Sequence, residues 1–307
     1  VTDSVSIRGL PVVEWVADHW VVAGPMTDYK TLLLYSESGD LVSSVGRAGD
    51  GPGEVRMISS LGPARGDSVV VGELLGRLHL FSIPGGGART LPPTEVGSAL
   101  LQLESGPLIS AGPVPSRRSV GYPLRRLDPV NGTVERLKLE QPPTLRPDHR
   151  AGASRMIARA SDSTFWASRP DAYVLSERSL DGTVVRRLER SADWFPERNR
   201  DPDYEDGAVP TLVDLTADER GVWVLVWTAD AGWEEPEDGS RAITPGRLRA
   251  KWDTRLELID PIEGSVISSR TFDEAYLGLT EGAFLYSVRD TPAGLRETVL
   301  TRISLKR

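Results

Sequence analysis

The sequence contains no cysteine, which excludes disulfides, thiolate metal sites and cysteine nucleophiles. Histidine is nearly as scarce. His19 lies at the start of an expected strand, His79 in an outer hairpin and His149 in a loop, so we do not expect the three to converge on a catalytic zinc. Lysine is also rare, at 4 residues against 32 arginines, a bias typical of GC-rich bacterial genomes.

Other features that the sequence lacks exclude further classes of function. No apolar run approaches the roughly 18 residues that a membrane-spanning helix needs. A formal net charge of -8 argues against a general nucleic-acid binder, which must neutralise phosphates. Neither G-x-S-x-G nor H-E-x-x-H occurs, so the common hydrolase and metalloprotease motifs are missing. On these grounds the sequence favours a protein that is not an enzyme.

What the sequence does contain is a repeat. Five hairpin turns are flanked by alternating apolar and polar residues, and a second pair of short apolar runs precedes each hairpin. Each unit therefore predicts four strands, and six units can be traced, which is typical of an all-β, six-bladed β-propeller with four antiparallel strands per blade. The nearest alternative is a seven-bladed ring. The five turn glycines, spaced 47, 46, 50 and 82 residues apart, are Gly39, Gly86, Gly132, Gly182 and Gly264.

The last unit ends in "TVLTRISLKR" and lacks a fourth strand. The N-terminal stretch "DSVSIRGL" can supply that strand, which would close the ring and leave no open sheet edge. We therefore expect one propeller domain over residues 1–307, closed by the N-terminal strand in the last blade.

A glycine-rich stretch, "GRAGDGPGE" at 46–54, invites comparison with phosphate-binding loops. Such loops lead directly into a helix, whereas Pro63 and Gly66 interrupt any helix here, and Glu54 stands where the last glycine of G-x-G-x-x-G would be. We interpret the stretch as the corner between the outer strand of one blade and the inner strand of the next.

Residues 46–86 resemble one NHL-type repeat, although Glu73 stands where that repeat usually has aspartate; the other five units match only in strand rhythm. The resemblance implies a six-bladed propeller like those of secreted or lipid-anchored bacterial proteins, and hence an extracytoplasmic location, periplasmic or secreted. Lyases built on NHL repeats hold a central zinc with several histidines, which this chain lacks. The matching positions are Gly49, Gly51, Pro52, Gly53, Val71, Arg77, Phe81 and Gly86.

The chain starts at Val1 and not at methionine. This favours a mature segment from which a signal or anchor peptide has been removed, although an arbitrary starting point would look the same.

One face of the propeller should carry the long connections, because the loop between strands two and three and the crossover to the next blade emerge on the same side. The longest are 139–153, 190–210 and 228–252, and loops of this length are usually functional or disordered. Their aromatic and arginine residues are of the types that dominate protein interfaces. Alternatively, the aromatic side chains hold their own loops on the rim and the arginines are simply solvated. The candidate binding residues are Arg117, Arg118, His149, Trp194, Arg198, Tyr204, Trp233 and Trp252.

A second candidate site is the central channel, toward which Glu14, Gln102, Arg155 and Asp214 can point from inner strands. Lactonase-type propellers hold calcium in the channel with carboxylates and asparagines, but this chain has only two asparagines, neither on an inner strand. We expect Glu14 and Asp214 to be hydrated or paired with Arg155, since buried charges need partners.

A stretch at 200–207, "RDPDYEDG", has acidic residues at alternating positions, as calcium loops do. Gly207 comes one residue late, and Leu212 stands where a bidentate glutamate should be, which favours a plain acidic surface loop. The sequence therefore assigns no metal and no cofactor, with calcium as the weak exception.

Together these features predict a non-catalytic propeller that binds a protein partner through its loop-rich face, as an extrinsic subunit of an envelope or membrane complex. The alternatives are a lactonase- or lyase-type hydrolase with a metal in the central channel, or a carbohydrate-binding propeller that uses Trp194 and Trp233 as stacking platforms.

Overall fold

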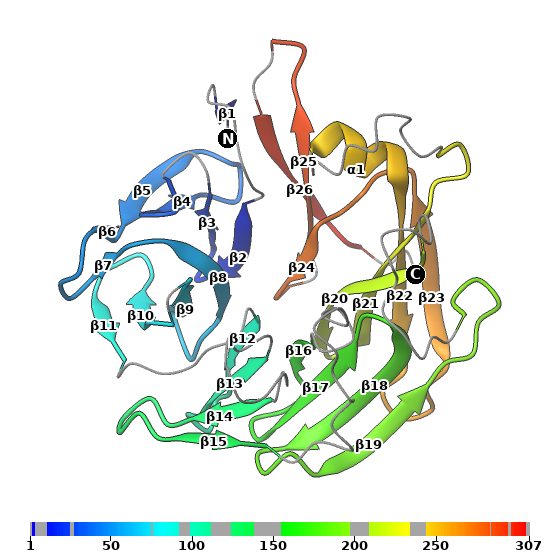
Figure 1. Ribbon diagram of the computed structural model, residues 1–307, viewed down its shortest axis with the longest axis horizontal. Coiled ribbons are helices and arrows are strands. Elements are labelled where there is room, and N and C mark those ends of the chain that lie inside the picture. The colour runs from blue at the N-terminus through cyan, green and yellow to red at the C-terminus, as the bar shows by residue number, and fades with distance from the viewer. Residues whose placement is uncertain are drawn as a thin grey trace, which may run out of the picture.

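The protein is an all-β, six-bladed β-propeller in which six four-stranded antiparallel sheets surround a central axis (Figure 1). This confirms the predicted fold class. A computed structural model describes residues 2–3, 11–24, 28–74, 76–91, 99–111, 124–137, 155–196, 209–233, 244–282, 284–293 and 296–304.

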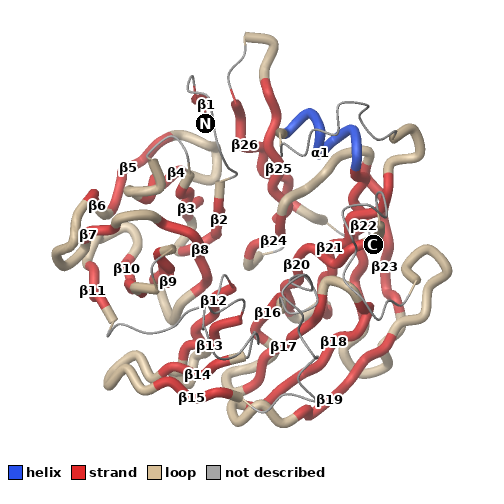
Figure 2. Tube along the Cα trace, viewed as in Figure 1, coloured by secondary structure: helices blue, strands red, loops and turns tan. Residues whose placement is uncertain are grey.

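The first five blades contribute their strands in chain order from the axis outward, and in the last blade β24, β25 and β26 are followed by β1 (Figure 2). Blades one to three consist of β2 (Val12–Val16), β3 (His19–Ala23), β4 (Leu32–Tyr35) and β5 (Leu41–Val45); β8 (Ile58–Pro63), β9 (Ser68–Glu73), β10 (Leu78–Ser82) and β11 (Ala88–Thr90); and β12 (Ala99–Gln102), β13 (Leu108–Ala111), β14 (Arg125–Leu127) and β15 (Val134–Arg136). Blades four to six consist of β16 (Met156–Arg159), β17 (Thr164–Arg169), β18 (Ala172–Ser179) and β19 (Val184–Glu189); β20 (Thr211–Asp218), β21 (Gly221–Ala229), β22 (Trp252–Ile259) and β23 (Val266–Phe272); and β24 (Gly278–Thr280), β25 (Phe284–Asp290) and β26 (Arg296–Arg302) with β1 (Thr2–Asp3).

Burial along the strands follows from their place in the blade. The second strand of a blade is covered on both faces by neighbouring blades, and β21, with the sequence "GVWVLVWTA", is buried over its first six residues. The outermost strand β19 alternates between half-buried and exposed positions, as a period-two strand at the rim should. The outer hairpins turn through glycines with positive φ, such as Gly39 at 89° and Gly182 at 84°.

The hydrophobic core is divided into clusters that lie between adjacent blades. In the described part of the chain, one such cluster fills each of the six interfaces, including the one between the first and last blades. In that last interface the rings of Trp20 and Phe284 meet edge to face, with centroids 4.6 Å apart. Packing between blades therefore runs around the whole ring.

The N-terminal strand is short where it is described. β1 pairs antiparallel with β26, with Thr2 opposite Glu297 and Asp3 opposite Arg296, so it occupies the place of a fourth strand in the last blade. Residues 4–10, which join β1 to the first blade, lie outside the described residues. Closure of the ring by the N-terminal strand therefore stays a prediction.

The glycine-rich stretch 46–54 is the corner expected from the sequence, because it leads from the outermost strand β5 to the innermost strand β8 of the next blade. Two short parallel strands, β6 (Arg47–Ala48) and β7 (Glu54–Val55), pair within it. The Glu54 carboxylate folds back to accept the Gly51 N–H at 2.8 Å.

The connection assigned to 228–252 differs from the expected plain loop in two ways. Strand β21 extends to Ala229, and the helix α1 (Pro245–Lys251) packs beside β22 and β25. Seven residues are too short for the apolar periodicity that reveals helices, so only its Thr244 cap and first-turn proline could have signalled it. None of the described helices has the length and hydrophobicity required to cross a membrane.

Candidate functional site

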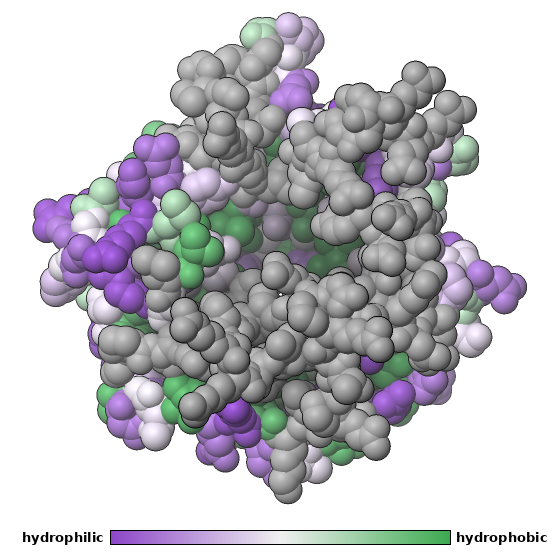
Figure 3. Space-filling view, viewed as in Figure 1, coloured by the Kyte–Doolittle hydropathy of each residue, from purple (hydrophilic) through white to green (hydrophobic). Residues whose placement is uncertain are grey.

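The candidate site is a cavity of about 360 Å³ on the propeller axis. Residues from the first strand of every blade line it, namely from β2, β8, β12, β16, β20 and β24. The space-filling view shows the hollow at the centre of the molecule, with hydrophobic residues on its walls (Figure 3). Its volume lies within the range of small-molecule sites, which is roughly 300–1,000 Å³.

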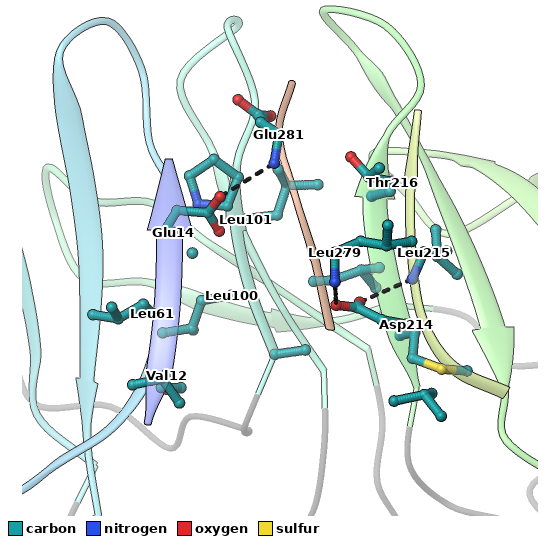
Figure 4. A pocket seen from close by; sticks show the side chains of 18 of the residues that line it. Val12, Glu14, Leu61, Leu100, Leu101, Asp214, Leu215, Thr216, Leu279 and Glu281 are labelled. Carbon is teal, nitrogen blue, oxygen red and sulfur yellow. Dashed lines mark hydrogen bonds between the residues drawn. The ribbon is translucent and has the colours of Figure 1, made fainter. Parts of the chain in front are cut away.

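Many of the side chains that line the cavity are aliphatic, and polar side chains and backbone groups make up the rest of its surface. Hydrophobic side chains enter it from all parts of the ring, and the close-up shows several of them facing the open space (Figure 4). They include Val12, Leu61, Leu100, Leu101, Met156, Leu215 and Leu279.

Two carboxylates interrupt this wall at the sides of β24. Glu14 Oε1 accepts the Glu281 N–H at 3.3 Å and the Trp15 N–H at 3.1 Å. Asp214 accepts the Leu279 N–H at 2.8 Å and the Leu215 N–H at 2.9 Å (Figure 4). The short strand β24 and the residue after it therefore donate two alternate N–H groups, one to each flanking blade.

Neither carboxylate has a cationic partner in the part of the chain that the structure describes. Among the described residues, Glu14 and Asp214 form no ion pair, although Glu14 is only 7% exposed. Burial, helped by the nearby Glu281 charge, raises the pKa of Glu14 to about 8, and burial raises the pKa of Asp214 to about 6. At neutral pH the first is mostly protonated and the second mostly ionised.

A tyrosine side chain lies in the same cavity as the two carboxylates because a glycine leaves space for its ring. Tyr286 on β25 lies opposite Gly278 on β24, and a Cβ at Gly278 would come within 2.6 Å of the Tyr286 ring and 2.9 Å of Asp214 Oδ2. The ring therefore crosses the innermost strand to reach the cavity. Burial, together with the Asp214 and Glu14 charges, raises the pKa of the Tyr286 phenol, so it remains a neutral hydroxyl.

Arginines lie at the two ends of the cavity wall. Arg159, at the end of β16, forms ion pairs with Glu104 and with Glu281, the latter at 3.4 Å. Arg155, just before β16, lines the cavity near the face of the long connections. Burial lowers its pKa to about 10, and the charged groups that act on it are Arg169, Asp171 and Arg178 of its own blade.

The structure thus places three of the predicted channel residues, Glu14, Arg155 and Asp214, in one cavity. The expected pairing of the carboxylates with Arg155 is not found among the described contacts. Gln102 is also placed differently from the expectation: its side chain accepts the Arg65 N–H and donates to the Gly106 carbonyl, which ties two turns of neighbouring blades.

Trp194, on the face of the long connections, is half-buried and contacts residues of both the fourth and the fifth blade. Its ring lies under the Arg255 guanidinium at 4.4 Å and contacts Tyr173 and Phe195. This is the arrangement in which an aromatic side chain fixes its own loop. Five other candidates lie outside the described residues, namely Arg117, Arg118, His149, Arg198 and Tyr204.

Trp233 and Trp252 form a separate aromatic group. Trp252 stacks on Trp227 with centroids 5.7 Å apart, and Lys251 Nζ lies 4.8 Å from the Trp233 ring centroid and 5.2 Å from that of Trp252. All are at the ends of β21, β22 and α1, where the connection between the second and third strands leaves the fifth blade.

A metal ion has few places to bind in the described residues. The one group of three acidic or histidine side chains with ligand atoms within 4.8 Å of one another is Asp230, Asp253 and Asp273, on the fifth blade and away from the channel lining. Glu14, Asp214 and Glu281 do not form such a group, so among the described residues the cavity has no trio of acidic or histidine side chains that converge. The acidic stretch 200–207 lies outside the described residues.

Comparison with known proteins finds likeness in structure only. No protein-family model matches the chain, and no curated protein matches its sequence. A member of the DUF4221 family from Bacteroides vulgatus superposes with a TM-score of 0.66 at 10% identity, covering 98% of this chain and 96% of its own. A protein from Bacteroides fragilis, provisionally described as exported, gives a TM-score of 0.56 at 14% identity, with 94% and 81% covered.

Virginiamycin B lyase from Staphylococcus aureus is also similar, with a TM-score of 0.48 at 10% identity, covering 100% of this chain and 89% of its own. At 10% and 14% identity, the likeness to the two Bacteroides proteins concerns the fold alone and says nothing about chemistry. Membership of the NHL family, which residues 46–86 suggest, is not established.

Sequence reasoning missed Glu281, Tyr286 and Arg159 as cavity residues. Glu281 and Arg159 stand at strand ends that resemble ordinary turns in the sequence, and Tyr286 belongs to a second strand. The only local signal was Gly278, a glycine within a strand, which often marks close approach of another group.

Proposed function

We propose that this propeller is a non-catalytic binding protein that engages a protein partner through the face carrying its long connections. The observation that carries this is the strand order of the blades, which makes the strands flanking those connections begin and end on one side of the ring. In every antiparallel blade, the loop between strands two and three and the crossover leave on the same side. The described aromatic group Trp227, Trp233, Trp252 and Lys251 lies on that side.

We further propose that the protein acts outside the cytoplasm, as an extrinsic subunit of an envelope or membrane complex. Support comes from the resemblance of residues 46–86 to repeats of secreted propellers, and from the likeness in fold to a protein provisionally described as exported.

In-cell crosslinking followed by affinity purification of the tagged full chain tests the protein-binding role. We expect a crosslinked partner that is lost from the double variant Trp233→Ala, Arg118→Ala, because aromatic and arginine side chains contribute most of the energy of protein interfaces. The control is Ile262→Ala, a 78% exposed side chain in an outer hairpin of the opposite face. Recovery of the same partner with the double variant, or its loss with the control, contradicts the proposal.

A further inference from the structure

The axial cavity has the properties of a site for a ligand other than a protein. It combines many aliphatic side chains with charged and polar groups from several blades, and small-molecule sites have such mixed linings. Its positive and negative charges differ in whether they are paired. The positive charge of Arg159 is already matched by Glu104 and Glu281, whereas Glu14 and Asp214 have no positive partner among the described residues.

Glu14 gives the clearest indication of what kind of ligand the cavity binds. Its carboxylate is more than nine-tenths buried, and both of its hydrogen bonds reach the same oxygen, Oε1. The other oxygen, Oε2, accepts no hydrogen bond from any described residue. This oxygen faces the cavity, where a ligand that carries an N–H donor and a positive charge can reach it.

We propose that the axial cavity binds a small organic cation, an ammonium group with a short apolar chain, which contacts Glu14 Oε2, while Asp214 adds a second negative charge to the same cavity. The ammonium group supplies the missing donors and charge, and the chain lies against the aliphatic residues around it. The Tyr286 hydroxyl, for which no described residue provides a hydrogen-bond partner, is available to accept a further N–H.

An inorganic cation fits the cavity less well. Calcium takes six to eight oxygen ligands, but each carboxylate here already accepts two backbone N–H groups, and the acidic side chains of the cavity do not converge as a trio. An ammonium ion needs only a few acceptors, and its apolar chain can pack against the aliphatic side chains of the cavity.

The charges facing Glu14 predict how protons respond to binding. Glu281 on the β24 side and Asp214 across the cavity disfavour its ionised form, and Tyr286 is neutral. Since the pKa of Glu14 is about 8, most molecules carry a protonated Glu14 at pH 7. A bound ammonium ion favours the carboxylate, so binding should release a proton to the buffer.

Isothermal titration calorimetry on the full chain tests the proposal, with hexylammonium chloride as the probe and hexan-1-ol, hexanoate and calcium chloride as comparisons. We expect saturable binding of hexylammonium that is tighter than that of the other three. The heats of binding measured at pH 7 in phosphate and in Tris should differ, because the two buffers take up the released proton with different enthalpies. The double variant Glu14→Gln, Asp214→Asn keeps the shape and acceptors but should weaken binding about tenfold or more.

The control is Glu135→Gln, which removes the same charge from an exposed position on β15 and should leave binding unchanged. If the double variant does not fold, Ala99→Leu gives a second test, because it fills the cavity without touching either carboxylate. Failure of hexylammonium to bind overturns the proposal, as does equal or tighter binding of hexan-1-ol, hexanoate or calcium. Unchanged affinity in a folded double variant, or in Ala99→Leu, also overturns it.

Discussion

At the scale of single residues, the buried glutamates of this protein are stabilised in two different ways. Glu257 is fully buried but accepts hydrogen bonds from Tyr173, Arg190 and Arg255. Although burial alone raises the pKa of Glu257, these bonds lower it on balance. Glu14 receives only backbone N–H groups, so burial dominates and its pKa rises. The first glutamate joins two blades, whereas the second is left able to change its charge.

Replacing Glu14 with Gln should change how stability depends on pH. A carboxyl whose pKa is raised by folding binds more protons in the folded than in the unfolded state, so its contribution is fully present below pH 4.5 and is lost as pH rises toward about 8. Relative to Glu14→Gln, the wild type should therefore lose on the order of a few kcal/mol over this window. Urea unfolding at pH 5 and pH 8.5 measures this difference, and parallel stability curves would show that Glu14 does not titrate as described.

At the scale of elements, the glycine-rich corner is held by an arginine from the hairpin beside it. Arg77 donates to the carbonyls of Gly49 and Asp50, both at 3.3 Å, and to the buried Glu73 carboxylate at 3.0 Å. Glu73 also contacts His79 Nε2 at 2.7 Å, and burial lowers the pKa of His79, which keeps it neutral. The corner, the second blade and its outer hairpin are thus joined through one buried carboxylate.

Replacing Arg77 with Ala should destabilise the protein by roughly 3 kcal/mol, because it leaves the Glu73 carboxylate buried without a cation. Chemical unfolding measures the loss. Arg56→Ala is the matched control, since Arg56 pairs with Asp50 of the same corner but both side chains are exposed, and it should cost less than about 1 kcal/mol. Similar costs for the two variants would mean that the buried network does not hold the corner.

At the scale of the whole molecule, the ring depends on the interface between its first and last blades. Trp15, Trp20 and Phe284 pack there, with ring centroids between 4.5 and 5.3 Å apart. β1 adds a pair of residues to the outer edge of the last blade. If the N-terminal strand closes the ring, it joins the two ends of the chain and holds this interface together.

Deleting residues 1–10 tests ring closure. We expect a melting temperature several degrees lower, because the last blade loses its outer strand and exposes an edge of β26. Removing only residues 305–307, which follow β26, serves as the control and should leave the melting temperature unchanged. Equal melting temperatures for the two truncations would show that the N-terminal strand contributes nothing to the ring.

The sequence by itself determined the propeller, because its signals are local. Alternating apolar residues and hairpin glycines such as Gly132 and Gly264 specify strands and turns, and their regular spacing repeats the blade. It also indicated that Glu14, Arg155 and Asp214 belong to inner strands, because their place within each repeat could be counted. The sequence did not predict the helix α1, since seven residues in a long connection are too few to show a clear helical period of apolar residues.

Only the tertiary structure decided the composition of the cavity. Residues 14, 214 and 281 are far apart in the chain, and whether charges so distant pair or stay unpaired depends on distances that closing the ring creates. Arg155 lines the same space as the two carboxylates, and the charges of its own blade, among them Asp171, also act on it. Tyr286 enters the cavity only because Gly278 of the neighbouring strand has no side chain. Such contacts across strands and blades are a property of packing, and a local signal such as Gly278 marks a close approach without showing which residue makes it.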